Sequence, residues 1–398
     1  MSRTASRPKS PHLTGDVPQQ NCPDIVAALE ECPSQEEAAA MPKSLYVKIG
    51  AVTLAVALIS LGSVSADAVT SRATAKQYGL NTYVQDLCQS APFWSSEASG
   101  QFAAFKALGA NSVALAFPVY TASLTSNSIV AQRTCGTNFQ SPSPARIAVA
   151  VKIAHSMHLR VLLRPLLEET SLSKGGGWRG VIKPSNTSLW FKNYLATLVP
   201  YLDMARQQKV EWFSIAAELD SMAHNSRWPA FIASAKRHYH GSVIFTINWE
   251  EGAAGKVKWG GTTPGMDTYQ ATGLPPTASV SQLLLAWNNA LKSTDTVPFA
   301  ISSATIDEIV ILAQDGAYAT PYKWSLPFNI HPFDQMVQAN WYSMACSFFK
   351  MHNMSGIYYW GVWYRDGANA FPKSPTANDP QGVQPASAAV IKKCFTGK

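Results

Sequence analysis

The chain is poor in charged residues and lacks the short motifs of several common enzyme classes. Asp, Glu, Lys and Arg make up 14% of the 398 residues, against roughly 25% in an average soluble chain, so its surface must be polar rather than ionic. It has no P-loop, no G-x-S-x-G and no H-E-x-x-H, and phosphate, serine and zinc hydrolase chemistry therefore lacks its usual local signature. The closely spaced His155 and His158 precede an expected strand, so we expect no metal and no cofactor.

Basic residues outnumber acidic ones but are not gathered into a tract. The formal charge of +7 comes from 32 Lys and Arg against 25 Asp and Glu, and no run of Lys and Arg is longer than two. This spread is not the footprint of a nucleic-acid partner. The glycines of 175–180 match G-x-G-x-x-G but lead into Val181-Ile182-Lys183-Pro184, which does not open a helix, so we reject a dinucleotide site.

The first 66 residues have the order of an export signal. Lys43 and Lys48 precede an apolar stretch from Ile49 to Leu61, and small residues follow at 63–66, as in a secretory signal peptide. The alternative is an uncleaved signal anchor, because 49–66 is just long enough to span a bilayer. We therefore expect a disordered leader or mis-called start over 1–40, a signal peptide or anchor over 41–66, and one secreted or membrane-anchored domain over 67–398.

Cysteine usage agrees with that compartment. Two of the six cysteines lie in the first 40 residues, and the chain has no C-x-x-C, so the remaining four indicate disulfides rather than metal. Four cysteines allow three connectivities. We favour Cys346–Cys394 with Cys88–Cys135, since Cys346 and Cys394 both lie in helix-like stretches near the end of the chain.

Strand-like apolar runs alternate with helical patterns from residue 75 onward, which is typical of βα units around a parallel sheet. Eight strands and no second domain predict an α/β fold of the (β/α)8 TIM-barrel type. The expected strands are Tyr83–Leu87, Ser112–Phe117, Arg160–Leu166, Trp212–Ala216, Val243–Ile247, Asp267–Gln270, Ala304–Ile309 and Gly356–Trp360. The expected helices are Ser96–Leu108, Pro144–His158, Leu189–Gln207, Trp228–Tyr239, Val280–Lys292 and Phe333–Met351.

Two glutamates stand at the downstream ends of strand-like runs. Glu218 follows one run and Glu308 another, and a barrel brings the C-terminal ends of its strands together at one mouth. Glycoside hydrolysis needs such a pair of carboxylates. The alternative is that each is a solvated residue just past a strand. Twelve Trp and fourteen Tyr are available to stack on sugar rings or to fill the core.

An ordered series of segments resembles glycoside hydrolase family 113, the β-mannanase-like barrels of clan A, over about residues 93–366. The segments are Gly109-Ala110-Asn111-Ser112-Val113-Ala114-Leu115, Ala154-His155 with Leu159-Arg160-Val161-Leu162-Leu163-Arg164-Pro165, Trp178-Arg179-Gly180, Trp190-Phe191 through Tyr194, Glu218-Leu219, Asp307-Glu308-Ile309 with Gln314-Asp315-Gly316-Ala317, and Ile357-Tyr358-Tyr359-Trp360.

The resemblance implies a retaining glycosidase that acts on a β-linked polysaccharide, with β-1,4-mannan preferred. It makes Glu218 similar to the acid/base and Glu308 to the nucleophile, and a retaining pair stands about 5–5.5 Å apart. Substrate-binding and partner roles fall on Arg164, Trp178, Arg179, Asn248, Tyr269 and Trp360. We expect a monomer that binds polysaccharide, no nucleic acid, and a membrane only if the leader is an uncleaved anchor.

The chain departs from the family pattern immediately before the acid/base. Clan A barrels commonly carry an Asn there, which bonds the sugar 2-hydroxyl, and this chain has Ala217. Arg164 and Asn248 are candidate substitute donors. The departure keeps two rivals open, namely a non-catalytic barrel that binds glycan and a structural cell-surface protein, since a fold does not guarantee its chemistry.

Overall fold

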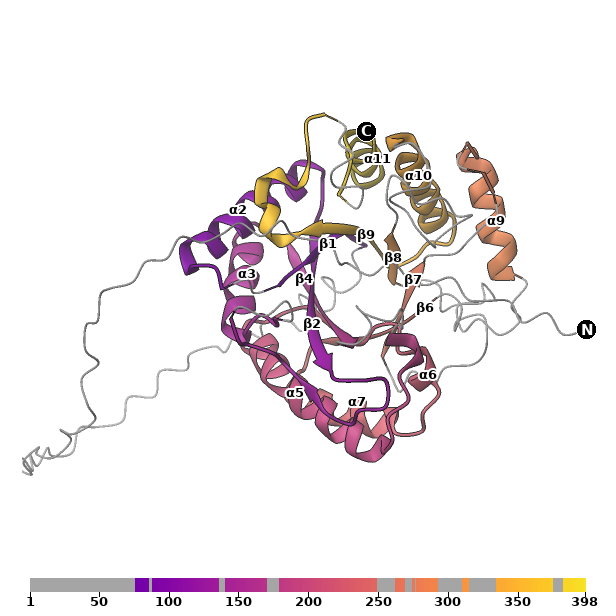
Figure 1. Cartoon of the computed structure of the whole chain (residues 1–398). Coiled ribbons are helices and arrows are strands. Elements are labelled where there is room, and N and C mark those ends of the chain that lie inside the picture. The colour runs from indigo at the N-terminus through magenta and orange to yellow at the C-terminus, as the bar shows by residue number, and fades with distance from the viewer. Residues whose placement is uncertain are drawn as a thin grey trace, which may run out of the picture. The chain divides into compact units, whose positions relative to one another are not determined.

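The computed structural model describes residues 76–85, 88–135, 140–169, 179–248, 262–268, 274–275, 277–292, 310–314, 334–374 and 382–398 (Figure 1). The leader segments 1–40 and 41–66 lie outside these residues, so the predictions of a disordered start and an export signal stay predictions. No helix in the described ranges combines the length and the apolar character needed to cross a bilayer.

Eight parallel strands close into a barrel, because β1 pairs in parallel with both β9 and β2. This closure confirms the predicted (β/α)8 fold. A short ninth strand, β3 (Ile129–Val130), pairs antiparallel with the end of β2. The barrel strands are β1 (Gln77–Tyr83), β2 (Ser112–Thr121), β4 (Arg160–Glu169), β5 (Trp212–Ala216), β6 (Ser242–Asn248), β7 (Thr263–Thr268), β8 (Val310–Gln314) and β9 (Gly356–Trp363).

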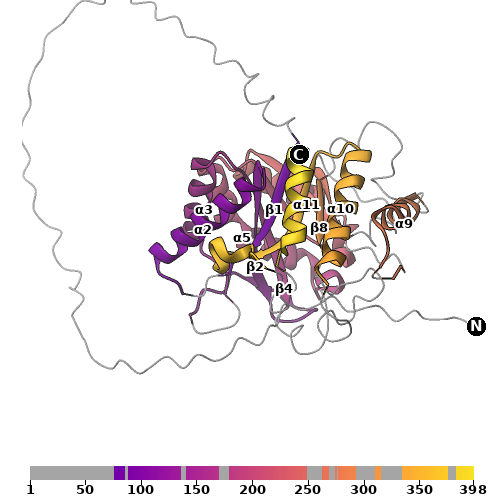
Figure 2. The same cartoon turned by 90° about the horizontal axis from the view of Figure 1, so that it is seen from above.

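Helices surround the strands on the outside of the barrel (Figures 1 and 2). Several begin at a side chain that accepts a backbone N–H of the first turn, as Ser90, Ser143, Asn186 and Asp334 do, which satisfies one of the orphan donors of a helix start. The helices are α2 (Ala91–Ala107), α3 (Pro144–Ser156), α5 (Thr187–Gln207), α6 (Asp220–Ala223), α7 (Trp228–His238), α9 (Val280–Lys292), α10 (Gln335–Met351) and α11 (Pro385–Thr396), with 3-10 turns η1 (Arg179–Val181) and η3 (Tyr364–Ala370).

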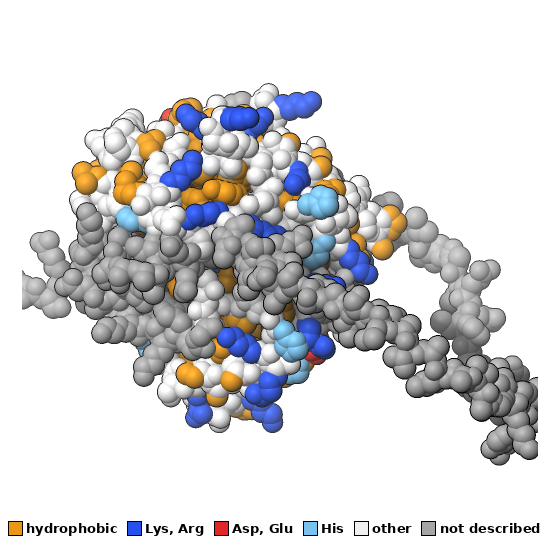
Figure 3. All heavy atoms as spheres, turned by 180° about the vertical axis from the view of Figure 1, so that it is seen from behind, with side chains coloured by type: hydrophobic (Ala, Val, Ile, Leu, Met, Phe, Trp, Pro, Cys, Tyr) orange, Lys and Arg blue, Asp and Glu red, His pale blue; other side chains and the backbone are white. Residues whose placement is uncertain are grey.

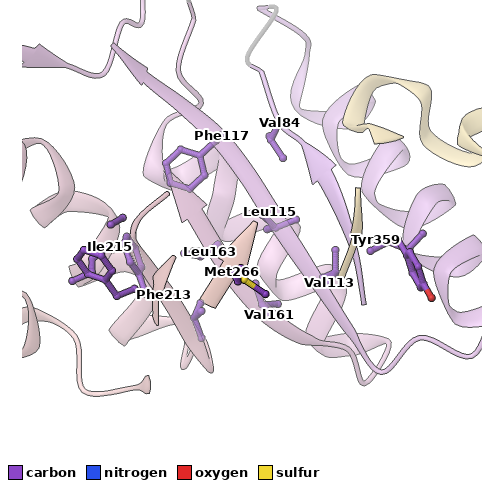
Figure 4. Packing of buried hydrophobic residues seen from close by; sticks show 14 of the residues in the cluster. Val84, Val113, Leu115, Phe117, Val161, Leu163, Phe213, Ile215, Met266 and Tyr359 are labelled. Atoms are coloured by element: carbon purple, nitrogen blue, oxygen red, sulfur yellow. The ribbon is translucent and has the colours of Figure 1, made fainter. Parts of the chain in front are cut away.

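Both faces of β2, β5, β6 and β9 are almost entirely buried, which explains why these strands read as mainly apolar runs. Alternate residues of β2 divide between two cores: Val113, Leu115 and Phe117 belong to the large cluster between strands and helices (Figure 4). The small Ala114 and Ala116 belong instead to two clusters inside the barrel. The deeper cluster is Ala114, Leu162, Trp212, Ile244 and Tyr358, and the one nearer the C-terminal ends of the strands is Tyr83, Ala116, Leu166, Ala217 and Trp360.

Two disulfides confirm the favoured pairing. Cys88 bonds to Cys135, and Cys346 of α10 bonds to Cys394 of α11. Each bond closes a long segment of chain, with sequence separations of 47 and 48 residues. The last two helices are therefore covalently joined to each other.

Three strands differ in position from their predictions. β1 is Gln77–Tyr83 rather than Tyr83–Leu87, and β7 is Thr263–Thr268 rather than Asp267–Gln270. β8 is Val310–Gln314 rather than Ala304–Ile309. The apolar run on either side of residue 309 has no internal marker of where the strand ends, and the pairing of β8 with β7 and β9 decides it.

The surface agrees with the scattered charge of the sequence. On the face that Figure 3 shows, Lys and Arg side chains are dispersed among uncharged and apolar ones rather than gathered into one stripe. A stripe of positive charge is the usual electrostatic footprint of a nucleic-acid-binding surface. This face therefore offers no such footprint.

Candidate functional site

Charged side chains gather where the parallel strands end. Glu218 is the second residue after β5, Glu168 is the penultimate residue of β4, and Asp267 is the penultimate residue of β7. Arg164 of β4 and Arg179 of η1 supply the positive charge. A barrel enzyme places its chemistry at this C-terminal face, so the cluster is the candidate active site.

Glu218 has a backbone conformation that is unusual for its residue type. Its φ is 52°, in the left-handed region, which costs a residue with a Cβ about 1–2 kcal/mol. His158, Lys209 and Asn353 also have positive φ, but each lies at the common left-handed position just after a helix, and Cys88 is held by a disulfide. Glu218 follows a strand instead, and strain of this kind clusters at functional sites.

Arg179 holds two carboxylates at once. Its Nη1 donates to Glu218 Oε2 at 2.6 Å, and its Nη2 donates to Glu168 Oε1 at 2.6 Å. Its Nε donates to the carbonyl of Leu167 at 3.3 Å. Burial lowers the pKa of Arg179, but the negative charges of Glu168 and Glu218 together raise it by more than burial lowers it. The pKa of Arg179 therefore lies above its ordinary value. The guanidinium therefore stays charged and orients Glu218 against a second carboxylate.

A second ion pair lies deeper in the barrel. Nη2 of Arg164 donates to Oδ2 of Asp267, and the two side chains are only 5% and 2% exposed. Burial raises the pKa of Asp267 to about 7, although Arg164 lowers it; Glu218 raises it further. Asp267 is thus a buried carboxyl group whose pKa is raised in part by the negative charge of Glu218.

Aromatic rings line the same end of the barrel. Trp360 of β9 packs edge-on against Tyr83, with ring centroids 6.1 Å apart, and Trp363 also packs edge-on against that tyrosine, at 5.3 Å. Ala217 belongs to the same cluster and is buried. The residue immediately before Glu218 is therefore a small side chain packed with these rings.

The structure brings some of the predicted site residues together and reveals others. Glu218 and Arg179 are ion-paired, Trp360 is in the cluster of Ala217, and buried Asn248 at the end of β6 donates its backbone N–H to Asp220 Oδ1 at 3.4 Å. Arg164, expected to serve Glu308, contacts Asp267. Trp178, Tyr269 and Glu308 lie outside the described residues.

Asp267 is the site residue that the sequence reasoning missed, and Glu168 is one that it noted after a strand without giving it a role. Glu168 follows a predicted strand, as Glu218 does, but nothing local distinguishes it from its neighbour Glu169. Asp267 stands at the start of a predicted strand, and its partner is 103 residues away. In the described ranges, no group of three or more His, Cys, Asp or Glu is placed to hold a metal ion.

Comparison with known proteins adds a family and a fold. The model of Glycoside Hydrolase Family 113 matches residues 85–379. A GH113 β-1,4-mannanase solved as a complex is 16% identical, with 81% of this chain and 100% of that chain covered and a TM-score of 0.61. The GH113 β-mannanase of Alicyclobacillus acidocaldarius, in complex with ManMIm, is 16% identical with 81% and 98% covered and a TM-score of 0.57.

At these identities the solved structures show that the fold is shared. A search of curated proteins by sequence found no match. The family match covers nearly all of the barrel, from just after β1 to just before α11, and therefore includes the charged residues of the candidate site, Glu168, Arg164, Arg179, Glu218 and Asp267.

Proposed function

The chain belongs to glycoside hydrolase family 113, and we propose that this glycosidase cleaves a β-linked polysaccharide, β-1,4-mannan first, with retention of configuration. Its acid/base is Glu218. The observation that carries the proposal is that Glu218 stands at the C-terminal end of a barrel strand in a left-handed conformation and is held there by Arg179.

The surroundings of Glu218 suit proton transfer to a glycosidic oxygen. The residue is 8% exposed, so it is near solvent at the mouth without being free to rotate. General acid–base catalysis by a positioned carboxyl group contributes about 10²–10⁴-fold in rate. Trp360 and Tyr83 pack in one cluster with Ala217, the residue before Glu218, and aromatic rings are suited to packing on the faces of sugars.

The second carboxylate of the proposal is Glu308, which would act as nucleophile. The assignment of Glu308 as nucleophile rests on the family resemblance, because Glu308 lies outside the described residues and β8 begins only at Val310. The argument from a strand end, which holds for Glu218, therefore does not support Glu308. A retaining mechanism needs this second group, so its assignment is tested separately below.

One observation favours the second candidate function, a non-catalytic barrel that binds glycan. β8 ends at Gln314, which is in register with Trp360 on β9. The sequence of this strand, Val310 to Gln314, contains no carboxylate, whereas a retaining pair needs a second one at the mouth. Ala217 stands where clan A barrels commonly have Asn before the acid/base, and this departure also favours the non-catalytic function.

The role of Glu218 is tested by a reducing-sugar assay on a panel of β-glycans that includes β-1,4-mannan. We expect wild-type protein to release sugar and Glu218→Gln to lose about 10²–10⁴-fold in kcat. Glu211→Gln is the matched control, because Glu211 flanks the other end of β5, where it binds His155 and the N–H of Val161. Equal activity in wild type and Glu218→Gln would reject the assignment.

The second carboxylate is tested with Glu308→Gln, with glycan binding measured beside turnover. If Glu308 is the nucleophile, Glu308→Gln abolishes turnover, and NMR of the fresh wild-type product shows a retained anomer. If the barrel only binds glycan, wild type is inactive on every substrate while binding persists. Inversion at the anomeric carbon would reject the retaining mechanism.

We also propose that the barrel works outside the cytoplasm, either secreted or anchored through 41–66. Its two disulfides support this location, because such bonds persist in oxidising compartments. Titration of thiols in natively exported protein tests it. We expect no free thiol from Cys88, Cys135, Cys346 and Cys394, and four reactive thiols would reject an oxidising compartment.

A further inference from the structure

The left-handed backbone of Glu218 stands at the start of a short segment that other elements hold in place. Its φ is 52°, and a conformation of this kind persists only where the surrounding structure determines it. Helix α6 begins two residues later and is only four residues long, and a helix this short is not stable by itself. Contacts with other elements therefore have to fix the conformation of Glu218.

Two side chains of α6 make such contacts. Asp220 Oδ1 accepts the backbone N–H of Asn248, at the end of β6, at 3.4 Å. The hydroxyl of Ser221 donates to the carbonyl of Ile182, which directly follows η1 and is 39 positions earlier in the chain. The segment after Glu218 is thus tied both to a barrel strand and to the turn η1.

The hydrogen bond of Ser221 closes a ring of contacts that includes the proposed acid/base. Arg179 of η1 donates from Nη1 to Glu218 Oε2 at 2.6 Å. The carbonyl of Arg179 accepts the N–H of Ile182 at 3.3 Å, and the carbonyl of Ile182 accepts the hydroxyl of Ser221. Because Ser221 is only three residues after Glu218, the ring joins the two partners of the ion pair a second time, through the backbone.

The two ends of the Ser221 bond differ in burial. Ile182 is completely buried, and the next residue, Lys183, donates its backbone N–H to the carbonyl of Leu124 at 2.8 Å. Ser221 is exposed. The bond therefore ties the Glu218 segment to a firmly packed point, and the hydroxyl can be removed without opening a cavity in the core.

We propose that Ser221 is a positioning residue for the hydrolytic site, whose hydroxyl holds the turn of Arg179 against the segment of Glu218 and so fixes the orientation of the acid/base carboxyl group. This inference rests on the proposed function, since the role is defined relative to the acid/base. In this role Ser221 neither touches the sugar nor transfers a proton. A displacement of about 1 Å at a reacting group can cost about 10²-fold in rate, so one neutral hydrogen bond can matter more to turnover than to stability.

The first test is the kinetics of Ser221→Ala on the β-glycan that wild type hydrolyses fastest. We expect kcat to fall about 10-fold with KM little changed, because a misoriented carboxyl group weakens transition-state stabilisation rather than binding. Ser221→Thr keeps the hydroxyl and should restore most of kcat.

Thr197→Val is the matched control for this test. The hydroxyl of Thr197 also donates to a distant carbonyl, that of Ile129 at 2.8 Å, but it joins α5 to β3 rather than the segments of Arg179 and Glu218. We expect this variant to keep wild-type kcat. Unchanged kcat in Ser221→Ala, or an equal fall in Thr197→Val, would overturn the proposal.

A second measurement needs no turnover, so failure of this proposal and failure of the proposed function can be told apart. Residues of one network are not additive, whereas sites without shared partners are. We therefore expect Arg179→Met to lower Tm by about 1–2 °C less in a Ser221→Ala background than in wild type, because the loosened turn already weakens the ion pair with Glu218. In a Thr197→Val background the fall should equal that in wild type.

Equal falls in all three backgrounds would refute the role of Ser221, whether or not the barrel is active. A smaller fall with Ser221→Ala, in a protein that hydrolyses no β-glycan, would support the link from Ser221 to the ion pair and reject the proposed function instead.

Discussion

Replacing Arg179 by Met should destabilise the barrel because one guanidinium holds two carboxylates. The side chains of Arg179, Glu168 and Glu218 are only 15%, 23% and 10% exposed, so solvent screens them weakly. Charge-assisted hydrogen bonds contribute about 1.5–3 kcal/mol each, and breaking a buried pair costs about 3–5 kcal/mol. After a discount for the partial exposure of Glu168, we expect Arg179→Met to lower the free energy of unfolding by about 3 kcal/mol at pH 7.

The assay is thermal unfolding with a matched arginine as control. For a barrel of this size a loss of 3 kcal/mol lowers Tm by about 5 °C. Arg206→Met is the control, because Arg206 makes a single exposed ion pair with Asp203 at 3.8 Å, and such pairs contribute about 0–1 kcal/mol. Adding Glu168→Gln to Arg179→Met should recover part of the loss, since it removes one of two facing negative charges. The reasoning fails if Arg179→Met melts with the control, or if Glu168→Gln deepens the loss.

Two further predictions concern the frame around the site. Serine in place of both Cys346 and Cys394 opens a loop of 48 residues and should cost about 4 kcal/mol by the chain-entropy relation, measured as a lower midpoint in guanidinium chloride with an unchanged far-UV spectrum. Trp228→Phe keeps a ring in the aromatic core but removes the bond from Nε1 to the carbonyl of Met222 at 2.7 Å. That carbonyl still accepts the N–H of Asn225 at 3.0 Å, so we expect the free energy of unfolding to fall only by the net value of one hydrogen bond, about 0.5–1.5 kcal/mol; unchanged stability in chemical denaturation would contradict this account.

The position of a strand could be predicted from the sequence where the strand is apolar on both faces. The prediction was wrong for β1, which begins with polar residues. The run Trp212–Ala216 is a strand in both sequence and structure. β1 was placed too late because its first residues are polar: Gln77 accepts a hydrogen bond from the hydroxyl of Tyr358, and Asn81 donates to the carbonyl of that tyrosine. Polar residues whose partners lie about 280 positions away do not look like a buried strand in a window of neighbours.

The residues of the candidate site differ in the same way, because some have a local signal in the sequence and others depend on distant partners. Glu218 was predictable because its local context, a lone carboxylate just past an apolar run, is itself the signal. Asp267 was not, because its significance comes from Arg164 on a non-adjacent strand. The position of β8 depends on its pairing with β7 and β9, so the residue at its mouth end, Gln314, could not be identified from the apolar run alone.

The direction of β1 determines from which side the barrel can be held. Its first residue, Gln77, is at the edge where the parallel strands start, whereas Glu218 lies at the edge where they end. Whatever precedes Gln77 therefore joins the barrel on the side away from the mouth. An attachment made directly at Gln77 would therefore lie at the opposite edge of the barrel from Glu218 and leave the mouth clear for a polymer much longer than the barrel.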